Sequence, residues 1–179
     1  MAKAVFLDRD GVLNQALVRD GKPYPPETPE ELHIYAEAAP ALARLKAAGF
    51  LLIVVTNQPD VGRGTQSRQT IDAMEALVRA ALPLDDVLVC CHDDRDRCVC
   101  RKPKPGMLLE AADRYGVDLA ESFMVGDRWR DIDAGANAGV RTILIDRRWQ
   151  ERGPEHAPDF RAGGIAEAAD LILAVSRVP

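Results

Sequence analysis

The sequence predicts a three-layer α/β/α fold with a central parallel β-sheet. Short apolar segments alternate with longer alanine- and leucine-rich segments along most of the 179 residues. Glycines follow several of the longer segments, as they do at the ends of helices. Strands that alternate with helices form parallel sheets with helices on both faces. Hydrophobic residues make up 47% of the chain, which suits one domain over residues 1–179.

The elements follow one another in a regular order. The expected strands are residues 4–7, 50–55, 87–90, 122–125 and 141–145, with 169–173 as a candidate sixth strand at an edge of the sheet. Continuous apolar runs of this length are typical of strands that are buried on both faces. The expected helices are residues 36–48, 67–81, 106–115 and 131–138. Gly49, Gly116 and Gly139 suit the left-handed ends of three of these helices. Residues 14–34 contain four prolines, so we expect an extended loop there.

Polar residues gather where the predicted strands end. Asp8 and Asp10 follow the first strand, Thr56 and Asn57 follow the second, and Asp127 follows the fourth. The loops at these ends of a parallel sheet build its ligand crevice. We therefore expect these side chains to face one site.

An Asp-x-Asp pair by itself is more often a solvated turn than a functional site. Here Gly11 permits a sharp turn after the pair, and Lys102 supplies a cation within Arg-Lys-Pro-Lys-Pro. A hydroxyl, an amide, a cation and several carboxylates are suitable groups for a phosphoryl group and a divalent cation. Their recurrence at successive strand ends favours a phosphoryl-transfer site over a series of unrelated turns.

The cysteines predict a second metal site. Cys90, Cys91, Cys98 and Cys100 fall within eleven residues, with His92 among them, and such clustering favours a metal over disulfides. The spacing Cys90-x-His92-x5-Cys98-x-Cys100 offers three thiolates and one imidazole, a common structural zinc set. The alternative is a group of reduced cysteines beside a surface histidine. Cys91 is either a packed thiol or a substitute ligand.

Residues 3–145 resemble the haloacid dehalogenase-like phosphohydrolases, subfamily IIIA. The resemblance rests on the strand-end segments described above and implies a Rossmann-like fold. It implies that Asp8 is a nucleophile that forms an aspartyl-phosphate, that Asp10 is the general acid and base, and that Thr56 and Lys102 hold the phosphoryl group. The segment between Asp10 and Thr56 is too short for a separate cap domain.

The same resemblance implies a catalytic Mg²⁺. Its implied ligands are Asp8, Asp10 through the backbone carbonyl, and Asp127. Asp131 and Arg128 would support these ligands without touching the ion. The cofactors expected are therefore catalytic Mg²⁺ and structural Zn²⁺ at residues 90–100.

Within this family the sequence resembles two groups, the heptose 1,7-bisphosphate 7-phosphatases and the histidinol-phosphate phosphatases. It is closer to the first in residues 6–11, 56–58 and 100–109, whereas the short spacing of the zinc loop resembles the second. The expected substrate-binding residues are Arg9, Asn57, Gln58, Arg63 and Arg101. Arg9, Arg63, Arg101, Lys104 and Arg128 would form a cationic rim that suits a second phosphate, or would pair with surface aspartates.

Composition limits the partners. A net charge of −5 disfavours general binding to nucleic acid or acidic membranes. The sequence contains no apolar run of about 18 residues, and its N-terminus lacks secretory features, so we expect a cytoplasmic location. A compact domain without a long apolar surface helix is expected to be a monomer, and the family resemblance implies a small phosphorylated metabolite as its substrate. Trp129 and Trp149 are expected to be packing groups.

The rival interpretations are a zinc-stabilised interaction module with an idle site and a phosphatase of polynucleotide ends.

Overall fold

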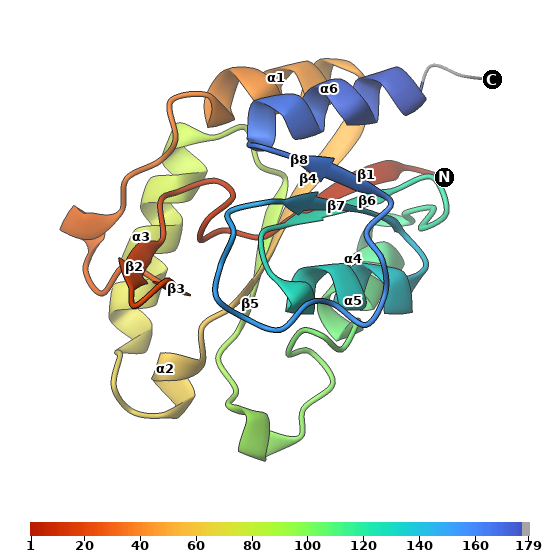
Figure 1. The fold of residues 1–179 in the computed structure, drawn as a ribbon. Coiled ribbons are helices and arrows are strands. Elements are labelled where there is room, and N and C mark those ends of the chain that lie inside the picture. Colours follow the sequence, from red (N-terminus) through yellow and green to blue (C-terminus); the bar gives the residue numbers. More distant parts are fainter. Residues whose placement is uncertain (177–179) are drawn as a thin grey trace.

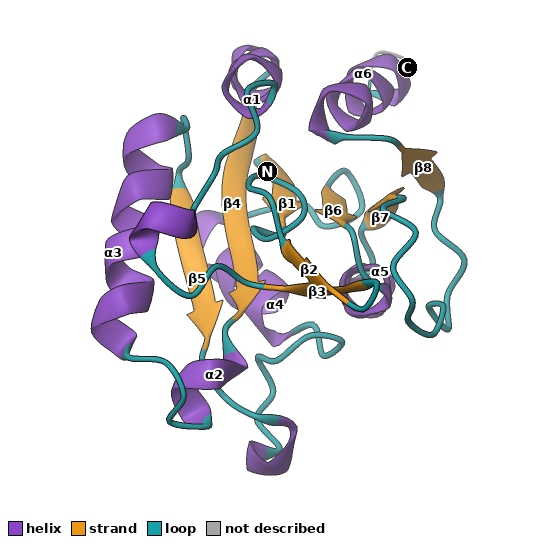
Figure 2. Ribbon diagram, turned by 60° about the vertical axis from the view of Figure 1, so that its left-hand side comes forward, coloured by secondary structure: helices purple, strands orange, loops and turns teal. Residues whose placement is uncertain are grey.

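The computed structural model describes residues 1–176, which form a parallel six-stranded sheet with helices on both faces (Figures 1 and 2). The strands are β1 (Lys3–Leu7), β4 (Phe50–Asn57), β5 (Asp86–Cys90), β6 (Phe123–Gly126), β7 (Arg141–Ile145) and β8 (Phe160–Ala162). Their order across the sheet is β5-β4-β1-β6-β7-β8, and every neighbouring pair is parallel. The predicted fold class is confirmed.

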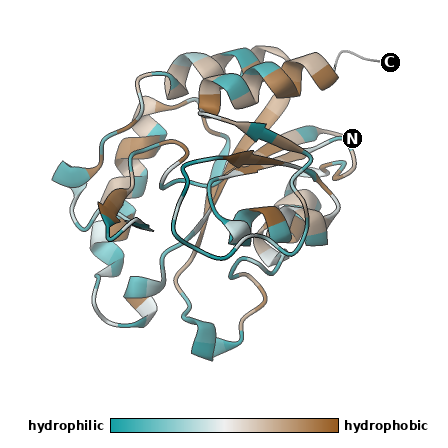
Figure 3. Ribbon diagram, in the orientation of Figure 1, coloured by the Kyte–Doolittle hydropathy of each residue, from teal (hydrophilic) through white to brown (hydrophobic). Residues whose placement is uncertain are grey.

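Two apolar layers hold the helices to the sheet. The helices are α1 (Ala38–Ala47), α2 (Pro59–Gly62), α3 (Arg68–Ala81), α4 (Gly106–Tyr115), α5 (Trp129–Ala138) and α6 (Ile165–Val175), with 3-10 turns at Pro29–Glu31 and Asp94–Asp96. Val5 and Leu7 of β1 pack in the layer that contains α1, α3 and α6. Ala4 and Phe6 pack in the layer that contains α4 and α5. Successive side chains of a strand point to opposite faces, so β1 contributes to both layers. Figure 3 shows hydrophobic residues along β4 and hydrophilic residues at the outer turn near residue 95.

The strand order of the sheet reverses between β1 and β6. The chain moves outward from β1 to β4 and β5, and then returns to the other side of β1 to form β6. In doubly wound sheets ligands bind beside the carboxyl ends of strands where the order reverses in this way. Asp8 and Asp127 follow β1 and β6 directly, so they flank this position.

The extended loop expected at residues 14–34 contains a β-hairpin. Strands β2 (Leu17–Arg19) and β3 (Lys22–Tyr24) pair antiparallel around Asp20 and Gly21, whose φ angles are 50° and 70°. Asp-Gly is a strong signal for a two-residue hairpin turn, so this turn interrupts the segment in which the prolines alone indicate an extended loop.

The candidate strand at residues 169–173 was wrong, because this segment lies within helix α6. Ile165, Ala168, Ala169 and Ile172 are buried, and their spacing of three and four residues forms one face of a helix that packs beside α1 (Figure 1). The sixth strand is β8, which is only three residues long. No helix within residues 1–176 is both long and apolar enough to span a bilayer.

Candidate active site

A cavity of about 290 Å³ lies at the carboxyl ends of β1 and β4. The hairpin, the loop after β4 and the cysteine-rich loop contribute its walls. The residues that line it are Asp8, Asp10, Ala16, Lys22, Pro23, Tyr24, Pro25, Thr56, Asn57, Pro59, Asp60, Arg63, Asp94, Arg101, Lys102, Arg128, Arg130, Asp131 and Glu151. Nine of the sequence-predicted site residues outside the zinc set line this one cavity: Asp8, Asp10, Thr56, Asn57, Arg63, Arg101, Lys102, Arg128 and Asp131. Asp127 does not line it, but a carboxylate oxygen of Asp127 lies within 4.8 Å of oxygens of Asp8 and Asp131.

Lys102 lies between two buried carboxylates on the cavity floor. Its Nζ donates to Asp8 Oδ1 at 2.8 Å, to Asp131 Oδ1 at 2.6 Å and to the carbonyl of Val55 at 2.7 Å. Burial opposes the charged form of Lys102, but Asp131 and Asp8 outweigh it and raise its pKa to about 12. Burial also raises the pKa of Asp8, to about 7, although Lys102 acts against this rise. The ammonium group therefore stays charged beside the predicted nucleophile.

The carboxylates here fit a divalent cation. Oxygens of Asp8, Asp127 and Asp131 lie within 4.8 Å of one another, and all three residues are buried. Asp127 Oδ1 is buried without a hydrogen-bond partner among residues 1–176. Burial, followed by the repulsion from Asp8 and Asp131, raises the pKa of Asp127 well above its ordinary value. Hard cations such as Mg²⁺ take oxygen ligands of this kind, and one would neutralise charge that Lys102 alone leaves unbalanced.

Glycines allow the close approach of these carboxylates. A Cβ atom on Gly11 would lie 2.0 Å from Asp127 Oδ2, and a Cβ atom on Gly126 would lie 2.0 Å from the Asp131 Cβ. Gly11 also has a φ of 87°, which is favourable for glycine. Larger residues at either position would push the acidic groups apart.

Four donors orient the Asp10 carboxylate. Arg9 Nε and an Arg9 terminal nitrogen donate to it at 3.1 and 3.0 Å, Asn14 Nδ2 at 3.0 Å and Gln58 Nε2 at 2.8 Å. Gln58 Nε2 also donates to Thr56 Oγ1 at 3.0 Å. These hydrogen bonds from buried side chains therefore fix the orientations of Asp10 and Thr56, which both line the cavity.

Two predicted substrate-binding residues do not line the cavity. Arg9 is fully buried, and its guanidinium donates to Glu75 of α3 at 2.6 Å as well as to Asp10. Gln58 is 1% exposed and bonds to Asp10 and Thr56 instead. Both side chains point into the protein interior in this structure, so their role in substrate binding stays a prediction.

Asn57 connects β4 to the segment that carries Lys102. Its Nδ2 donates to the Lys102 carbonyl at 3.1 Å, and the Lys102 amide donates to Asn57 Oδ1 at 3.1 Å. This paired contact fixes the backbone of Lys102 relative to the strand that ends at the cavity.

The arginines at the rim pair with carboxylates. Arg63 Nε lies 2.9 Å from Asp93, and Arg101 Nε lies 2.8 Å from Asp94. In this structure, therefore, both Arg63 and Arg101 pair with aspartates, which is the alternative to a site for a second phosphate. Arg128, expected to act behind the metal, lines the cavity and pairs with Glu151 at 3.0 Å.

Lys104 donates to the carbonyl of Cys98 and does not line this cavity, unlike the other four residues of the predicted cationic rim except Arg9. Sequence reasoning also missed Tyr24, Arg130 and Glu151, which line the cavity. Tyr24 follows the Asp-Gly turn, the signal that could have located it. Arg130 lies inside the Asp127–Asp131 segment, but no local pattern marks Glu151.

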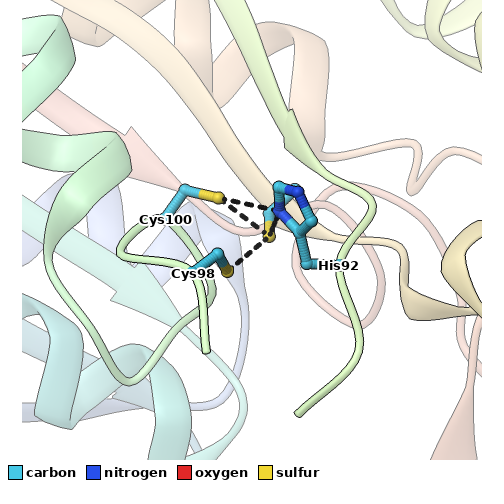
Figure 4. Close-up of side chains that lie close together, drawn as sticks. His92, Cys98 and Cys100 are labelled. Carbon is cyan, nitrogen blue, oxygen red and sulfur yellow. Dashed lines mark hydrogen bonds between the residues drawn. The ribbon is translucent and has the colours of Figure 1, made fainter. Parts of the chain in front are cut away.

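The predicted zinc ligands form a separate cluster beside the cavity (Figure 4). Donor atoms of Cys90, His92, Cys98 and Cys100 lie within 4.8 Å of one another. The Cys90 sulfur lies 3.2 Å from that of Cys100 and 3.9 Å from that of Cys98, and His92 Nδ1 lies 3.3 Å from the Cys100 sulfur. Such separations suit four ligands at the corners of a tetrahedron. Cys91 lies outside the cluster, with its sulfur 3.5 Å from Arg68.

The comparisons with known proteins agree with this geometry. The family model described as haloacid dehalogenase-like hydrolase matches residues 26–139. The chain is similar to the D-glycero-beta-D-manno-heptose-1,7-bisphosphate 7-phosphatase of Bordetella bronchiseptica, with 37% identity over 151 residues and 80% of each chain covered. It is 34% identical to the Escherichia coli K12 enzyme of the same name over 183 residues, which cover 94% of this chain and 93% of that protein.

Two further relatives bear on fold and substrate. The crystal structure of D,D-heptose 1,7-bisphosphate phosphatase from B. bronchiseptica, complexed with magnesium and phosphate, has a TM-score of 0.80 and 34% identity, and the match covers 97% of this chain and 99% of that chain. A histidine biosynthesis bifunctional protein of Campylobacter jejuni is 31% identical over 166 residues, which cover 89% of this chain and 46% of that protein. The family match, the parallel sheet order and the cavity at its carboxyl edge lead to one conclusion: the chain belongs to the haloacid dehalogenase-like hydrolases and is a phosphatase of that family.

Proposed function

We propose that this phosphatase is Mg²⁺-dependent, forms an aspartyl-phosphate at Asp8, and removes the 7-phosphate of D-glycero-D-manno-heptose 1,7-bisphosphate. The observation that carries the chemistry is the buried group of Asp8, Asp131 and Lys102 at the cavity, with Asp127 within 4.8 Å of both carboxylates. The similarity to enzymes of that name over most of both chains supports the substrate. Residues 1–179 would form one catalytic domain.

The proposed reaction has two steps. The Asp8 carboxylate attacks the phosphorus atom and forms a P–O bond, while the bond to the substrate oxygen breaks and Asp10 donates a proton to that oxygen. Water then attacks the phosphorus of the aspartyl-phosphate, Asp10 accepts its proton, and the bond to Asp8 breaks to release phosphate. Covalent catalysis of this kind divides one difficult displacement into two easier ones. General acid–base assistance is typically worth about 10²–10⁴-fold in rate.

The residues around Asp8 would reduce the electrostatic repulsion in this reaction. A carboxylate that attacks a phosphate dianion meets electrostatic repulsion. Lys102, whose Nζ is already 2.8 Å from Asp8 Oδ1, would stabilise the phosphoryl oxygens. The hydroxyl of Thr56 would donate a hydrogen bond to one of these oxygens. Mg²⁺, held by Asp8, Asp127 and the Asp10 backbone carbonyl with Asp131 nearby, would supply further neutralisation of the phosphoryl charge.

The zinc cluster would have a structural role. Four protein ligands leave no position for a reactive water in a tetrahedral site. The cluster closes the loop that carries Asp94 and Arg101 to the cavity. We therefore propose Zn²⁺ as the element that orders one wall of the substrate site, and a small phosphorylated metabolite bound by a monomer as the functional state.

Histidinol phosphate is the second candidate substrate. The 31% identity to a histidine biosynthesis bifunctional protein favours it, and so does the short spacing of the zinc loop. The mixed charge of the cavity rim, where Arg128 meets Glu151 and Arg101 meets Asp94, could accept either a second phosphate or an amine.

The test is phosphate release with Mg²⁺ from both anomers of the heptose bisphosphate, from histidinol phosphate and from a panel of sugar phosphates. The expected result is a kcat/KM at least about tenfold higher on a heptose bisphosphate, equivalent to about 1.4 kcal/mol of transition-state preference. Asp8→Asn should abolish turnover. A preference for histidinol phosphate would replace the substrate, and turnover by Asp8→Asn would refute the mechanism.

A further inference from the structure

Residues 146–156, which form most of the segment between β7 and β8, cross beside the cavity between the β2–β3 hairpin and α5 (Figure 1); we call them the strap. Its backbone and side chains are attached to the site at several points. Arg147 Nε donates to the Gly11 carbonyl at 3.1 Å, and the Gln150 amide donates to the Gly21 carbonyl in the hairpin turn at 2.9 Å. The strap is therefore fixed against both the loop after β1 and the hairpin.

The other end of the strap is attached to α5 and the residue before it. Glu151 pairs with Arg128 at 3.0 Å. The amides of Glu155 and His156 donate to Asp133 Oδ1 at 2.9 and 3.0 Å. Anchors on both sides restrict the position of the residue between them, Trp149.

Trp149 makes a direct contact with the acidic group of the site. Its indole Nε1 donates to Asp127 Oδ2 at 2.6 Å. An indole nitrogen can only donate a hydrogen bond, so it occupies one oxygen of Asp127 and leaves the other free. The free oxygen, Oδ1, is the buried atom without a hydrogen-bond partner among residues 1–176.

We propose that Trp149 is a positioning residue that orients Asp127 so that its Oδ1 is presented to the metal. The inference rests on the proposed function, because it requires a cation at Asp127. Hydrogen bonds from outside the coordination sphere orient carboxylate ligands, and their loss typically costs about 10–100-fold in metal affinity or activity. The missing Cβ of Gly11 leaves the space in which Asp127 Oδ2 meets the indole.

Packing alone accounts poorly for this arrangement. Trp149 is only partly buried, and it lies in a strap of mostly exposed polar residues rather than in either apolar layer. Trp129 is the natural comparison, since its ring contacts the guanidinium groups of Arg130 and Arg152. Its indole nitrogen makes no hydrogen bond within the described part of the chain.

The test measures metal binding without turnover. Zinc-loaded protein, freed of Mg²⁺, is titrated with Mn²⁺ while free Mn²⁺ is followed by electron paramagnetic resonance. Trp149→Phe keeps an aromatic ring and removes the N–H, and should raise the Mn²⁺ dissociation constant about tenfold or more. Trp129→Phe is the matched control and should stay within twofold of wild type, whereas Asp127→Asn should show the largest loss.

Activity provides a second readout that a merely structural role would not produce. In Trp149→Phe the Mg²⁺ concentration for half-maximal activity should be higher than in wild type. At saturating Mg²⁺, kcat and the substrate KM of the variant should equal those of wild type. A kcat that stays low at saturating Mg²⁺, together with unchanged Mn²⁺ affinity, would instead indicate general damage and overturn the proposal.

A third measurement does not depend on the folding of Trp149→Phe. In the Trp129→Phe protein Trp149 is the sole tryptophan, since the sequence contains two, and Mn²⁺ should quench its fluorescence with the dissociation constant found by resonance. Absence of quenching would overturn the inference. If wild type binds Mn²⁺ and Trp149→Phe binds it within twofold as tightly, only the role of Trp149 fails. If wild type binds no Mn²⁺, the proposed metal site fails as well.

Discussion

Arg9 illustrates how adjacent residues in this chain take different roles. It stands between two residues that line the cavity, yet its own side chain is fully buried against Glu75 and Asp10. Burial opposes the charge of Arg9, but the two carboxylates outweigh it and raise its pKa. Burial likewise raises the pKa of Glu75, which Arg9 counteracts. The role visible here is to connect α3 to the loop after β1.

Removing Arg9 should therefore affect stability before substrate affinity. Arg9→Met leaves Glu75 and Asp10 without their cation, and loss of one partner of a buried ion pair typically costs about 3–5 kcal/mol. Urea unfolding measures this change. Arg68→Met, which removes an exposed pair with Asp72, is the control and should cost at most about 0.5 kcal/mol. A large rise in KM with unchanged stability would restore Arg9 to the substrate site.

Asp127 should show a conflict between function and stability. Because burial and two neighbouring carboxylates disfavour its charge, Asp127→Asn should stabilise the metal-free protein by about 1 kcal/mol, or raise Tm by about 2–4 °C for a chain of this size. The same variant should lose activity. Thermal unfolding in a chelator tests the first expectation. Added Mg²⁺ should then raise the Tm of wild type and leave that of Asp127→Asn unchanged; a lower Tm for the variant in chelator would contradict this account.

At the scale of elements, the cysteine-rich loop after β5 carries a wall of the cavity. Asp94 and Arg101 lie inside the loop or directly after it, and both line the cavity. The segment from Asp93 to Arg97 is mostly exposed and charged, so burial contributes little to its order. A metal bound by the surrounding cysteines and histidine would supply that order.

Cys98→Ser and Cys91→Ser form a matched pair for this loop. Cys98 belongs to the cluster and Cys91 does not. Cys98→Ser should lose bound zinc and reduce kcat/KM about tenfold or more, since small displacements of positioning groups are costly in rate. Cys91→Ser should retain both. Metal analysis by mass spectrometry and steady-state kinetics measure the two effects, and equal zinc content in both variants would reject the assigned ligands.

Across the whole molecule, Asp86 joins the two helix layers at the edge of the sheet. It lies at the start of β5 and accepts hydrogen bonds from Arg79 of α3 at 3.0 Å and from Arg114 and Tyr115 of α4 at 2.8 Å each. Burial opposes its ionisation, but the hydrogen bonds from Tyr115 and Arg79 outweigh burial and lower its pKa below 3.8.

This lowered pKa makes stability depend on pH. The ionised Asp86 stabilises the folded state above the unfolded value of 3.8, and this contribution is lost as pH falls through the lower folded value. Wild type should therefore be more stable than Asp86→Asn at pH 6, and the difference should shrink below about pH 4. Urea unfolding over this range measures it. Tyr115→Phe should show a smaller change of the same sign, and a difference that does not vary with pH would exclude this linkage.

The local sequence pattern was sufficient to predict those elements whose signals lie within one continuous segment. Residues 106–115 and 141–145 form the expected helix and strand without change of boundary. The four donors of the observed cluster, Cys90, His92, Cys98 and Cys100, likewise fall within eleven consecutive residues. Hydrophobic period, end glycines and ligand spacing are properties of consecutive residues, so they can be interpreted before the chain is folded.

Tertiary structure decided what depends on residues far apart in the chain. Arg9 meets Glu75 across 66 positions, and Asp127 meets Trp149 across 22. No local period indicates which way a side chain turns at the end of a strand, because that direction follows from which element packs beside it. Alternating strands and helices therefore defined the α/β fold and the identity of the reactive edge. The orientation of each polar side chain at that edge was decided only when distant segments came together to bury, pair or leave free its charged atoms.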